Sequence, residues 1–397
     1  MADFLDYLSW RGDLSFTSVP LCETDAAIFA KLSYFPFDGI AGADLFLHEK
    51  KLSEIFAECE KTEVPSFVKD AKDLLLASAP TERFGNVRLS GYVNALDPEG
   101  LLQFSAVLFR TDGNHAVVAF RGTDDSITGW KEDFLLAFRE HIPSHDCASA
   151  YLKKAFENPK ARITVTGHSK GGHLGVYAAA SLDPVFLDRL ETVYNFDGPG
   201  FRPDFLGSSG YGSILGKIRN FIPESSVVGC LFEHRGETVT VASDKRGIDQ
   251  HNLSSWQTLG PSFVRVPARS RDSIQIEKSI KAWTADMTPE ETEEFVTSLF
   301  RLISLAEISN FQELAAKPLT GLKLFTTKAP GDKKMFQQGM KKLIYELSRT
   351  YFPMIVQPKG KTGKRAIGTD EKSPKKLSGP KALKDGSKNQ TVRTQNA

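Results

Sequence analysis

The part of the sequence best suited to chemistry is a serine between glycines. Ser169 lies in the run 167–171, Gly-His-Ser-Lys-Gly, which fits the pattern G-x-S-x-G. In this pattern the serine sits on a tight turn between a strand and a helix, and the glycines let the two elements pass closely. The turn exposes the hydroxyl, and the N-terminus of the following helix favours negative charge there. The pattern therefore predicts Ser169 as a nucleophile.

The residues on both sides of Ser169 fit this setting. A short β-branched run typical of a buried strand covers 162–166, and an alanine-rich stretch typical of a helix covers 174–182. A structural turn and an inactive hydrolase fold remain as alternatives. His168 and His173 are expected to be packing or surface residues, because a histidine next to the serine in sequence points away from the elbow.

A serine nucleophile needs hydrogen-bond donors for the negative charge that develops on the substrate oxygen. The main-chain amide of Lys170 is the first expected donor. The second should come from a loop after an earlier strand, and residues 116–123 provide one, with Gly122 permitting a close backbone approach. We expect the amide or the hydroxyl of Thr123 to face the charge. The alternative is that this Gly-Thr pair only begins the next helix.

The general base should be one of two late histidines. In α/β hydrolases the chain order is Ser, then Asp or Glu, then His, and only His234 and His251 follow the nucleophile and its helix. His251 is preferred because it lies in a loop-like segment, 249–256, whereas His234 lies in a region typical of a strand and turn. A third possibility is that both are ordinary surface residues.

The acid of the triad should follow a strand of the sheet and hold the imidazole in the correct tautomer. Glu224 comes directly after the run 218–223, which contains the strand expected at 218–222, and Asp197 comes after the strand expected at 192–196. We prefer Glu224, with Asp197 as the alternative acid, because Asp197 also suits the shaping of its Gly-Pro turn. Asp244 and Asp249 are weaker candidates.

The ordered set of these motifs resembles the class 3 lipases, and more closely an uncharacterised bacterial branch of lipase-like α/β hydrolases. The resemblance covers most of residues 1–260 and is carried by the runs 120–123, 167–171 and 196–200, by Trp130 and Asp133, and by Gln250, His251 and Trp256. It implies a Ser-His-acid triad with an acid near Glu224. Lys170 departs from the leucine usual in class 3 lipases, which bears on the polarity of the pocket.

The elements around these motifs predict the fold class and the domains. Strand-like and helix-like segments alternate from Val87 onward, which indicates a parallel sheet covered on both faces. We therefore expect an α/β-hydrolase fold with a mostly parallel central sheet, a helical N-terminal region and a C-terminal helical appendage. The expected boundaries are 1–268 for the lipase-like domain, 269–356 for the appendage and 357–397 for a disordered basic tail.

Composition excludes several other classes of protein. The 397 residues are 41% hydrophobic and 25% charged, as in globular proteins, and the formal net charge of +1 gives no bias toward nucleic acid. Four scattered cysteines without a CxxC spacing argue against a disulfide scaffold or a zinc site. The first residues do not resemble a secretory signal, and no apolar run reaches the roughly 18 residues of a membrane span. We expect a soluble, cytoplasmic protein.

The substrate is predicted from the aromatic content and the resemblance. Phenylalanine outnumbers tyrosine 28 to 9, and Phe134 and Phe138 lie where lipase-like folds carry a lid, although core packing is the plainer role for each. We expect cleavage of carboxylic, lipid-like esters through an acyl-enzyme, with no metal or cofactor. A thioesterase or acyltransferase on the same scaffold and an inactive interaction module are the alternatives. The basic tail is a possible weak membrane contact.

Overall fold

In the computed structural model, the described residues are 2–136, 139–285 and 287–305, together with 337, 339, 341 and 342. The tail expected at 357–397, most of the appendage beyond residue 305, and Phe138 lie outside the described residues. The described part of the appendage forms two helices, α11 (Arg271–Ala285) and α12 (Pro289–Leu305). These belong to the same compact unit as the sheet, residues 1–353.

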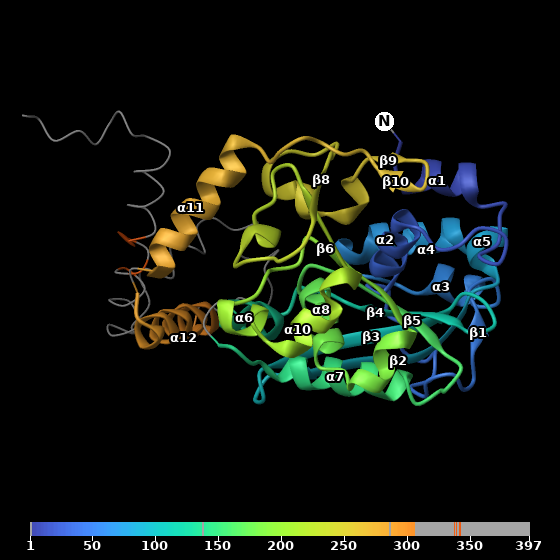
Figure 1. Cartoon of the computed structure of the whole chain (residues 1–397), viewed down its shortest axis with the longest axis horizontal. Coiled ribbons are helices and arrows are strands. Elements are labelled where there is room, and N and C mark those ends of the chain that lie inside the picture. The colour runs from blue at the N-terminus through green and yellow to red at the C-terminus, as the bar shows by residue number, and fades with distance from the viewer. Residues whose placement is uncertain are drawn as a thin grey trace, which may run out of the picture. The chain divides into compact units, whose positions relative to one another are not determined.

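The centre of the described chain is an eight-stranded sheet whose strands lie side by side in sequence order (Figure 1). The first four strands pair antiparallel, and the strands from β4 to β8 pair parallel. The strands are β1 (Lys50–Lys51), β2 (Arg88–Asp97), β3 (Leu102–Arg110), β4 (His115–Phe120), β5 (Arg162–His168), β6 (Leu190–Phe196), β7 (Ile218–Pro223) and β8 (Thr238–Val241). A small hairpin of β9 (Thr258–Leu259) and β10 (Ser262–Phe263) stands apart from this sheet.

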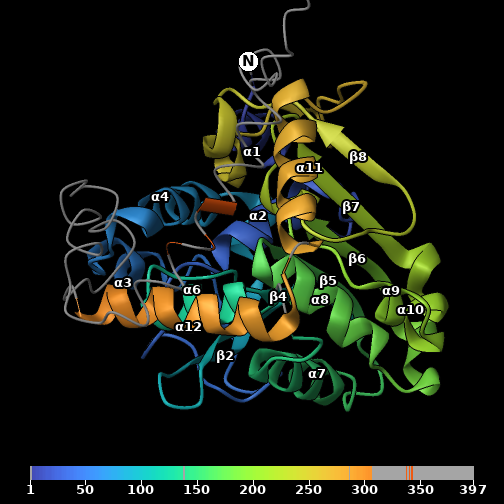
Figure 2. The same cartoon turned by 90° about the vertical axis from the view of Figure 1, so that its left-hand side faces the viewer.

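Helices cover both faces of the sheet (Figure 2). One face is covered by N-terminal helices: α1 (Phe4–Arg11), α2 (Glu23–Leu32), α3 (Phe56–Lys61), α4 (Lys69–Ser78) and α5 (Glu82–Gly85). The other face is covered by α7 (Pro143–Ala155), α8 (Lys170–Ala180), α9 (Pro203–Leu206) and α10 (Ser209–Ile214). Helix α6 (Ile127–Leu136) follows β4 and packs against α12.

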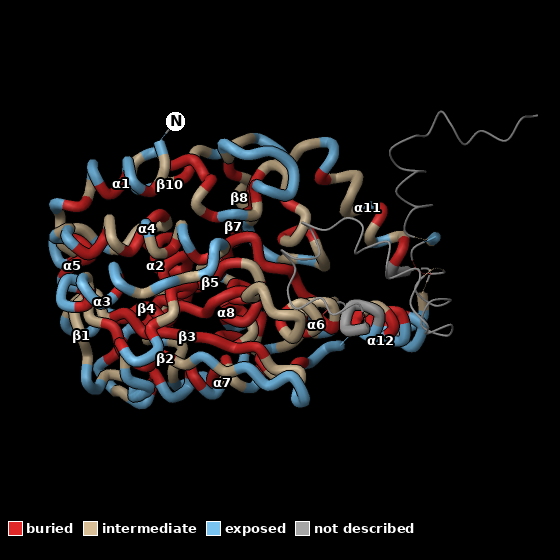
Figure 3. Tube along the Cα trace, turned by 180° about the vertical axis from the view of Figure 1, so that it is seen from behind, coloured by how far each residue is buried: buried red, intermediate tan, exposed pale blue. Residues whose placement is uncertain are grey.

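Strand β4 shows why a nearly continuous apolar run forms a strand here. Val117 and Ala119 belong to the core cluster on the α2 side, whereas Ala116, Val118 and Phe120 belong to the cluster under α7 and α8. Successive side chains of a strand point to opposite faces, and both faces of this sheet are covered. The strand is therefore buried on both sides, as Figure 3 shows for the centre of the sheet.

The fold class expected from the sequence is confirmed: this is an α/β-hydrolase fold with a helical N-terminal region. The segments expected as strands at 162–166, 192–196 and 218–222 correspond to β5, β6 and β7. Among the described residues, no helix is both long enough and apolar enough to cross a membrane.

Because β5, β6 and β7 are parallel, their carboxyl ends meet at one edge of the sheet. Ser169, Asp197 and Glu224 are the residues that follow these three strands. Ligand and catalytic sites of open α/β sheets lie beyond the carboxyl ends of the strands. The topology thus brings the candidate residues to the edge where chemistry is expected.

Candidate active site

The nucleophile elbow is a sharp turn between β5 and α8. Ser169 has φ 56° and ψ −133°, a left-handed conformation that is rare for residues other than glycine. A Cβ atom at Gly167 would lie 2.2 Å from the carbonyl oxygen of Gly171, and one at Gly171 would lie 2.1 Å from that of Phe120. Both glycines are therefore required by the close approach of strand and helix.

A histidine–carboxylate pair lies next to this elbow. Nδ1 of His251 is 2.6 Å from Oδ2 of Asp197, and the carboxylate is fully buried while the imidazole is 26% exposed. The other carboxylate oxygen accepts hydrogen bonds from the Ser226 hydroxyl (2.5 Å) and the Gly229 amide (3.1 Å). The residue before Asp197 accepts a main-chain hydrogen bond from Ser169 (2.9 Å), which ties the acid to the elbow.

The residue before the nucleophile, His168, contacts the main chain of His251. Nε2 of His168 is 2.7 Å from the main-chain oxygen of His251, and the two rings lie 4.6 Å apart. Because a carbonyl only accepts, Nε2 of His168 carries the proton, and its Nδ1 accepts from the Tyr34 hydroxyl (2.9 Å). Burial lowers the pKa of His168 well below its ordinary value, so this ring is neutral.

His251 keeps one nitrogen free for chemistry. With Nδ1 bonded to Asp197, its Nε2 makes no hydrogen bond to any residue of the described chain. His251 ends a 3-10 turn, η5 (Gly247–His251), and the Trp256 indole anchors this turn by donating to the Gln250 carbonyl (2.8 Å). The preferred base therefore lies beside the elbow with a nitrogen available to accept a proton.

The preferred acid, Glu224, is not brought to the imidazole. Its amide donates to the Val241 carbonyl (3.0 Å), which extends the β7–β8 ladder by one residue, and its carbonyl accepts from Ser270 (2.8 Å). In the described chain its side chain makes no hydrogen bond to His251. The carboxylate that the structure pairs with His251 is the alternative, Asp197.

His234, the second candidate base, occupies a different environment. Its Nε2 is 2.9 Å from the Gly229 carbonyl, and burial lowers its pKa below the ordinary value. Its hydrogen-bond partner is thus a main-chain carbonyl rather than a carboxylate. This environment does not activate an imidazole as a base.

The loop after β4 lies directly against the elbow. A Cβ atom at Gly122 would be 2.6 Å from the carbonyl oxygen of His168 and 3.1 Å from Cβ of Ser169. The hydroxyl of the next residue, Thr123, donates to Oδ2 of Asp133 on α6. Because that proton is committed to Asp133, the donor left to Thr123 for a substrate oxygen is its main-chain amide.

Lys170 is the first residue of α8, so its amide is one of the helix N–H groups without an intrahelical partner. Its side chain is almost completely buried and paired with Glu132. The sequence predicts a donor role for the amide of Lys170 but no contact for its side chain. It assigns no catalytic role to Asp133 or His168. The replacement of leucine by lysine at position 170 is the signal that pointed to a polar network here.

Asp133 is the candidate-site carboxyl with a raised pKa. Burial raises its pKa to about 6, and this rise is opposed by the charge of Lys170 and by the hydrogen bond from Thr123. The like charge of Glu132 raises the pKa further, and His251 lowers it. Asp133 therefore responds electrostatically to both the buried lysine and the candidate base.

Several phenylalanines, including Phe134, pack against other elements in the core. Phe134 packs edge-on against Phe300 of α12 at a ring distance of 5.6 Å. Phe35 and Phe37 are fully buried in the core under the N-terminal helices. These contacts account for much of the phenylalanine excess by packing between elements.

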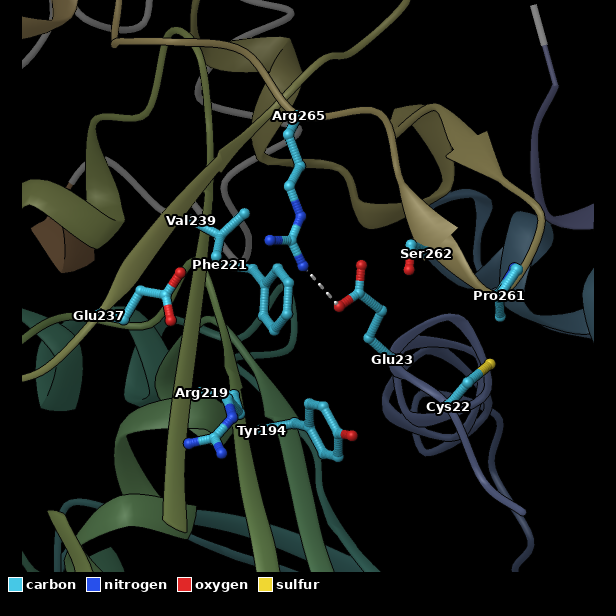
Figure 4. Close-up of a pocket in the computed structure, with 10 residues that line it drawn as sticks. All are labelled: Cys22, Glu23, Tyr194, Arg219, Phe221, Glu237, Val239, Pro261, Ser262 and Arg265. Atoms are coloured by element: carbon cyan, nitrogen blue, oxygen red, sulfur yellow. Dashed lines mark hydrogen bonds and ion pairs between the residues drawn. The ribbon is translucent and has the colours of Figure 1, made fainter. Parts of the chain in front are cut away.

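A cavity of about 290 Å³ is lined by residues from several elements (Figure 4). Its floor includes Tyr194 and Phe221, and Arg265 at its rim pairs with Glu23 (3.4 Å). Ser169, Asp197 and His251 are not among its lining residues.

The fold and the elbow define an α/β hydrolase of the lipase-like kind, as the sequence resemblance predicted. Residues 78–301 match the family described as Mbeg1-like, and the chain belongs to that family.

Solved structures that resemble this chain are lipases. M37 lipase is 16% identical over 53% of this chain and 70% of that one, with a TM-score of 0.35. A fungal lipase–inhibitor complex is 16% identical over 55% of this chain and 79% of that one, with a TM-score of 0.35. The propeptide complex of Rhizomucor miehei lipase is 17% identical over 55% of this chain and 67% of that one, with a TM-score of 0.33. No curated protein sequence matches the chain.

Proposed function

We propose that this protein is a serine hydrolase that cleaves carboxylic esters of lipid-like substrates through Ser169, His251 and Asp197. The observation that carries the proposal is the 2.6 Å hydrogen bond from Nδ1 of His251 to the buried Asp197 carboxylate, beside a serine on a strained elbow. A nucleophile, a base and an orienting acid are the three parts of a Ser-His-acid triad.

The proposed reaction proceeds through an acyl-enzyme. Nε2 of His251 takes the proton of Ser169 as the hydroxyl oxygen attacks the ester carbonyl carbon. The negative oxygen of the tetrahedral intermediate is stabilised by the main-chain amides of Thr123 and Lys170. His251 then gives the proton to the leaving alcohol. Water, deprotonated by His251, attacks the acyl carbon, and His251 then gives this proton to the Ser169 oxygen as the acyl–oxygen bond breaks and the acid leaves.

Asp197 fits the acid's role through its other hydrogen bonds. Ser226 and Gly229 occupy one carboxylate oxygen, which leaves the other aimed at His251. This arrangement would fix the proton of His251 on Nδ1 and stabilise the imidazolium formed in the transition state. Asp197 rather than Glu224 is therefore the acid we propose.

Turnover of p-nitrophenyl esters of increasing acyl length tests this proposal, with acyl-CoA thioesters as the comparison. Ser169→Ala should lower kcat on the order of 10⁶-fold, as expected when a triad nucleophile is lost. The melting temperature should be unchanged, because the Ser169 hydroxyl makes no hydrogen bond within the described chain. The matched control is Ser181→Ala at the exposed end of α8, where the hydroxyl bonds the Tyr177 carbonyl.

Ester turnover that survives in Ser169→Ala would overturn the proposal. A higher kcat/KM for acyl-CoA than for every ester would keep the nucleophile and replace the substrate class by thioesters. No turnover of either substrate class by the wild-type chain, together with no covalent adduct on Ser169, would favour the inactive interaction module.

A further inference from the structure

A lysine ammonium is buried one residue after the candidate nucleophile. The Lys170 side chain is 1% exposed. Its Nζ donates to the main-chain oxygen of Gln103 (2.9 Å), to Oε1 of the same residue (2.6 Å) and to Oε2 of Glu132 (2.8 Å). An ammonium has three protons, so each of them has a partner in this network.

The carboxylate of Glu132, which pairs with Lys170, also has several hydrogen-bond donors. Glu132 is fully buried. Besides the bond from Lys170, it accepts hydrogen bonds from the main-chain amides of Gln103 (3.2 Å) and Ser144 (3.1 Å) and from the Ser144 hydroxyl (2.5 Å). These residues come from β3, α6, α7 and α8. One ion pair therefore joins four elements at a single point behind the elbow.

Such a pair is weak evidence for stability in itself. Removing two charges from water is costly, and well-packed apolar residues often replace a buried ion pair without loss of stability. Hydrogen bonds with fixed donor and acceptor positions do, however, define how the elements lie relative to one another. The leucine usual in class 3 lipases at position 170 has no such directional contacts.

The same network reaches the oxyanion loop through the next residue of α6. Asp133 follows Glu132, and its Oδ2 accepts the Thr123 hydroxyl. Its Oδ1 is buried without a hydrogen bond and lies 4.0 Å from Nζ of Lys170. Among the described residues, the charged or titratable groups that interact with this carboxyl include Lys170, Glu132, His251 and Tyr34.

We propose that the Lys170 side chain is a positioning residue for the oxyanion hole. Its ammonium fixes α6 against the elbow, and α6 in turn holds Thr123 through Asp133, so that the Thr123 amide faces the substrate oxygen. The inference rests on the proposed hydrolase function, because it assigns that amide as a donor. It also makes α6 a fixed part of the site rather than a lid that moves away on substrate binding.

This role predicts a change in the pH dependence of kcat when Lys170 is replaced. The Thr123–Asp133 hydrogen bond is strongest when the carboxylate is ionised, and Lys170 favours ionisation by lowering the Asp133 pKa. Without the ammonium the pKa of Asp133 rises above about 6. The acidic limb of kcat should then move to higher pH.

The experiment compares Lys170→Met, Glu132→Gln and the double variant with wild type. The double variant removes both charges of the Lys170–Glu132 pair, so neither partner is left behind alone, and it keeps the test meaningful when either single variant is poorly folded. Lys217→Met is the matched control: it removes an ammonium that donates to the Leu190 carbonyl, away from the candidate site. The readouts are kcat, KM and their pH profiles with a p-nitrophenyl ester, and the rate and position of fluorophosphonate labelling.

The double variant should lose about tenfold to a hundredfold in kcat with little change in KM, as expected for a displaced oxyanion donor. Its labelling of Ser169 should slow in parallel, and its acidic limb should shift upward, while Lys217→Met behaves as wild type. A folded double variant with wild-type kcat and pH profile would overturn the positioning role alone. Absence of a Ser169 adduct on the wild-type chain would overturn the proposed function and this inference together.

Discussion

Two histidine pairs flank the nucleophile elbow, and they differ in what surrounds their rings. In the first pair, His168 and His251, one ring is buried and neutral while the other is bonded to the Asp197 carboxylate and partly exposed. In the second pair, His145 and His173, both rings are buried, and Nε2 of one lies 2.9 Å from Nε2 of the other.

Each ring nitrogen of the second pair has a hydrogen-bond partner, and none of these partners is a carboxylate. Nδ1 of His173 donates to the carbonyl oxygens of Pro199 (3.1 Å) and Gly200 (3.2 Å), so its Nε2 accepts from His145. Nδ1 of His145 in turn accepts from the Ile142 amide (3.3 Å). Burial, reinforced for His145 by neighbouring histidines, lowers the pKa of His145 to about 2 and that of His173 to about 4.

We therefore propose that the surroundings, rather than the residue type, select the base from these histidines. His145, His168 and His173 have both ring nitrogens engaged with neutral groups. His251 has a carboxylate on one nitrogen and a free second nitrogen. Only this last combination suits proton transfer to and from a substrate.

The strongest test of this comparison removes the carboxylate. Asp197→Asn should lower kcat by roughly 10⁴-fold, because the amide favours the wrong tautomer of His251 and does not stabilise the imidazolium. Glu224→Gln is the matched control and should stay within about tenfold of wild type. Both variants are measured by ester turnover, with folding checked by circular dichroism. A larger loss in Glu224→Gln than in Asp197→Asn would return the acid role to Glu224.

A smaller effect on kcat is expected when His168, the neutral histidine of the first pair, is replaced. His168→Phe retains an aromatic ring but loses the hydrogen bonds to His251 and Tyr34. Misplacement of the base should lower kcat by on the order of 10²-fold or less. Pre-steady-state ester turnover measures this loss. A kcat unchanged within error would mean that the ring of His168 does not position His251.

The smallest expected effect is the contribution of the second pair to the free energy of unfolding at acid pH. His173 has a pKa of about 4 in the folded chain, below the ordinary value of about 6.5 in the unfolded chain. Its stabilising contribution is therefore complete above pH 6.5 and is lost as the pH falls toward 4, by at most about 1.4 kcal/mol per pH unit for one histidine. Protonation of His173 at Nε2 also breaks the hydrogen bond that it accepts from His145.

Urea unfolding between pH 4 and 7 measures this dependence. His173→Gln should flatten the decline in unfolding free energy below pH 6.5, whereas the control His115→Gln, at an exposed position, should leave it unchanged. Ester kcat at neutral pH should change less in His173→Gln than in His168→Phe. A reversed order would mean that the two pairs do not divide catalysis and stability as proposed.

The sequence was sufficient for the elements that local patterns specify. The β-branched run before Ser169, the glycines around it and the small residues after it predict β5, the elbow and α8, because each feature acts within a few residues. The capping pattern at Thr288 and Pro289 likewise predicts the start of α12, where the Thr288 hydroxyl accepts from the Glu291 amide (3.2 Å).

The sequence was insufficient where a contact depends on register between distant segments. The choice between Glu224 and Asp197 rests on how far the β7–β8 ladder extends and on where the turn 247–251 returns to the sheet. The burial of Lys170 against Glu132 depends on the packing of four elements. No spacing rule within a single segment determines either arrangement.

The central claim is that a serine on the elbow is activated by His251. Fluorophosphonate treatment of the wild-type chain, followed by peptide mapping by mass spectrometry, tests it most directly. The account predicts one phosphonyl adduct, on the peptide that contains Ser169, and strongly reduced labelling in His251→Ala. An adduct on a different serine, or labelling of Ser169 at the wild-type rate without His251, would contradict it.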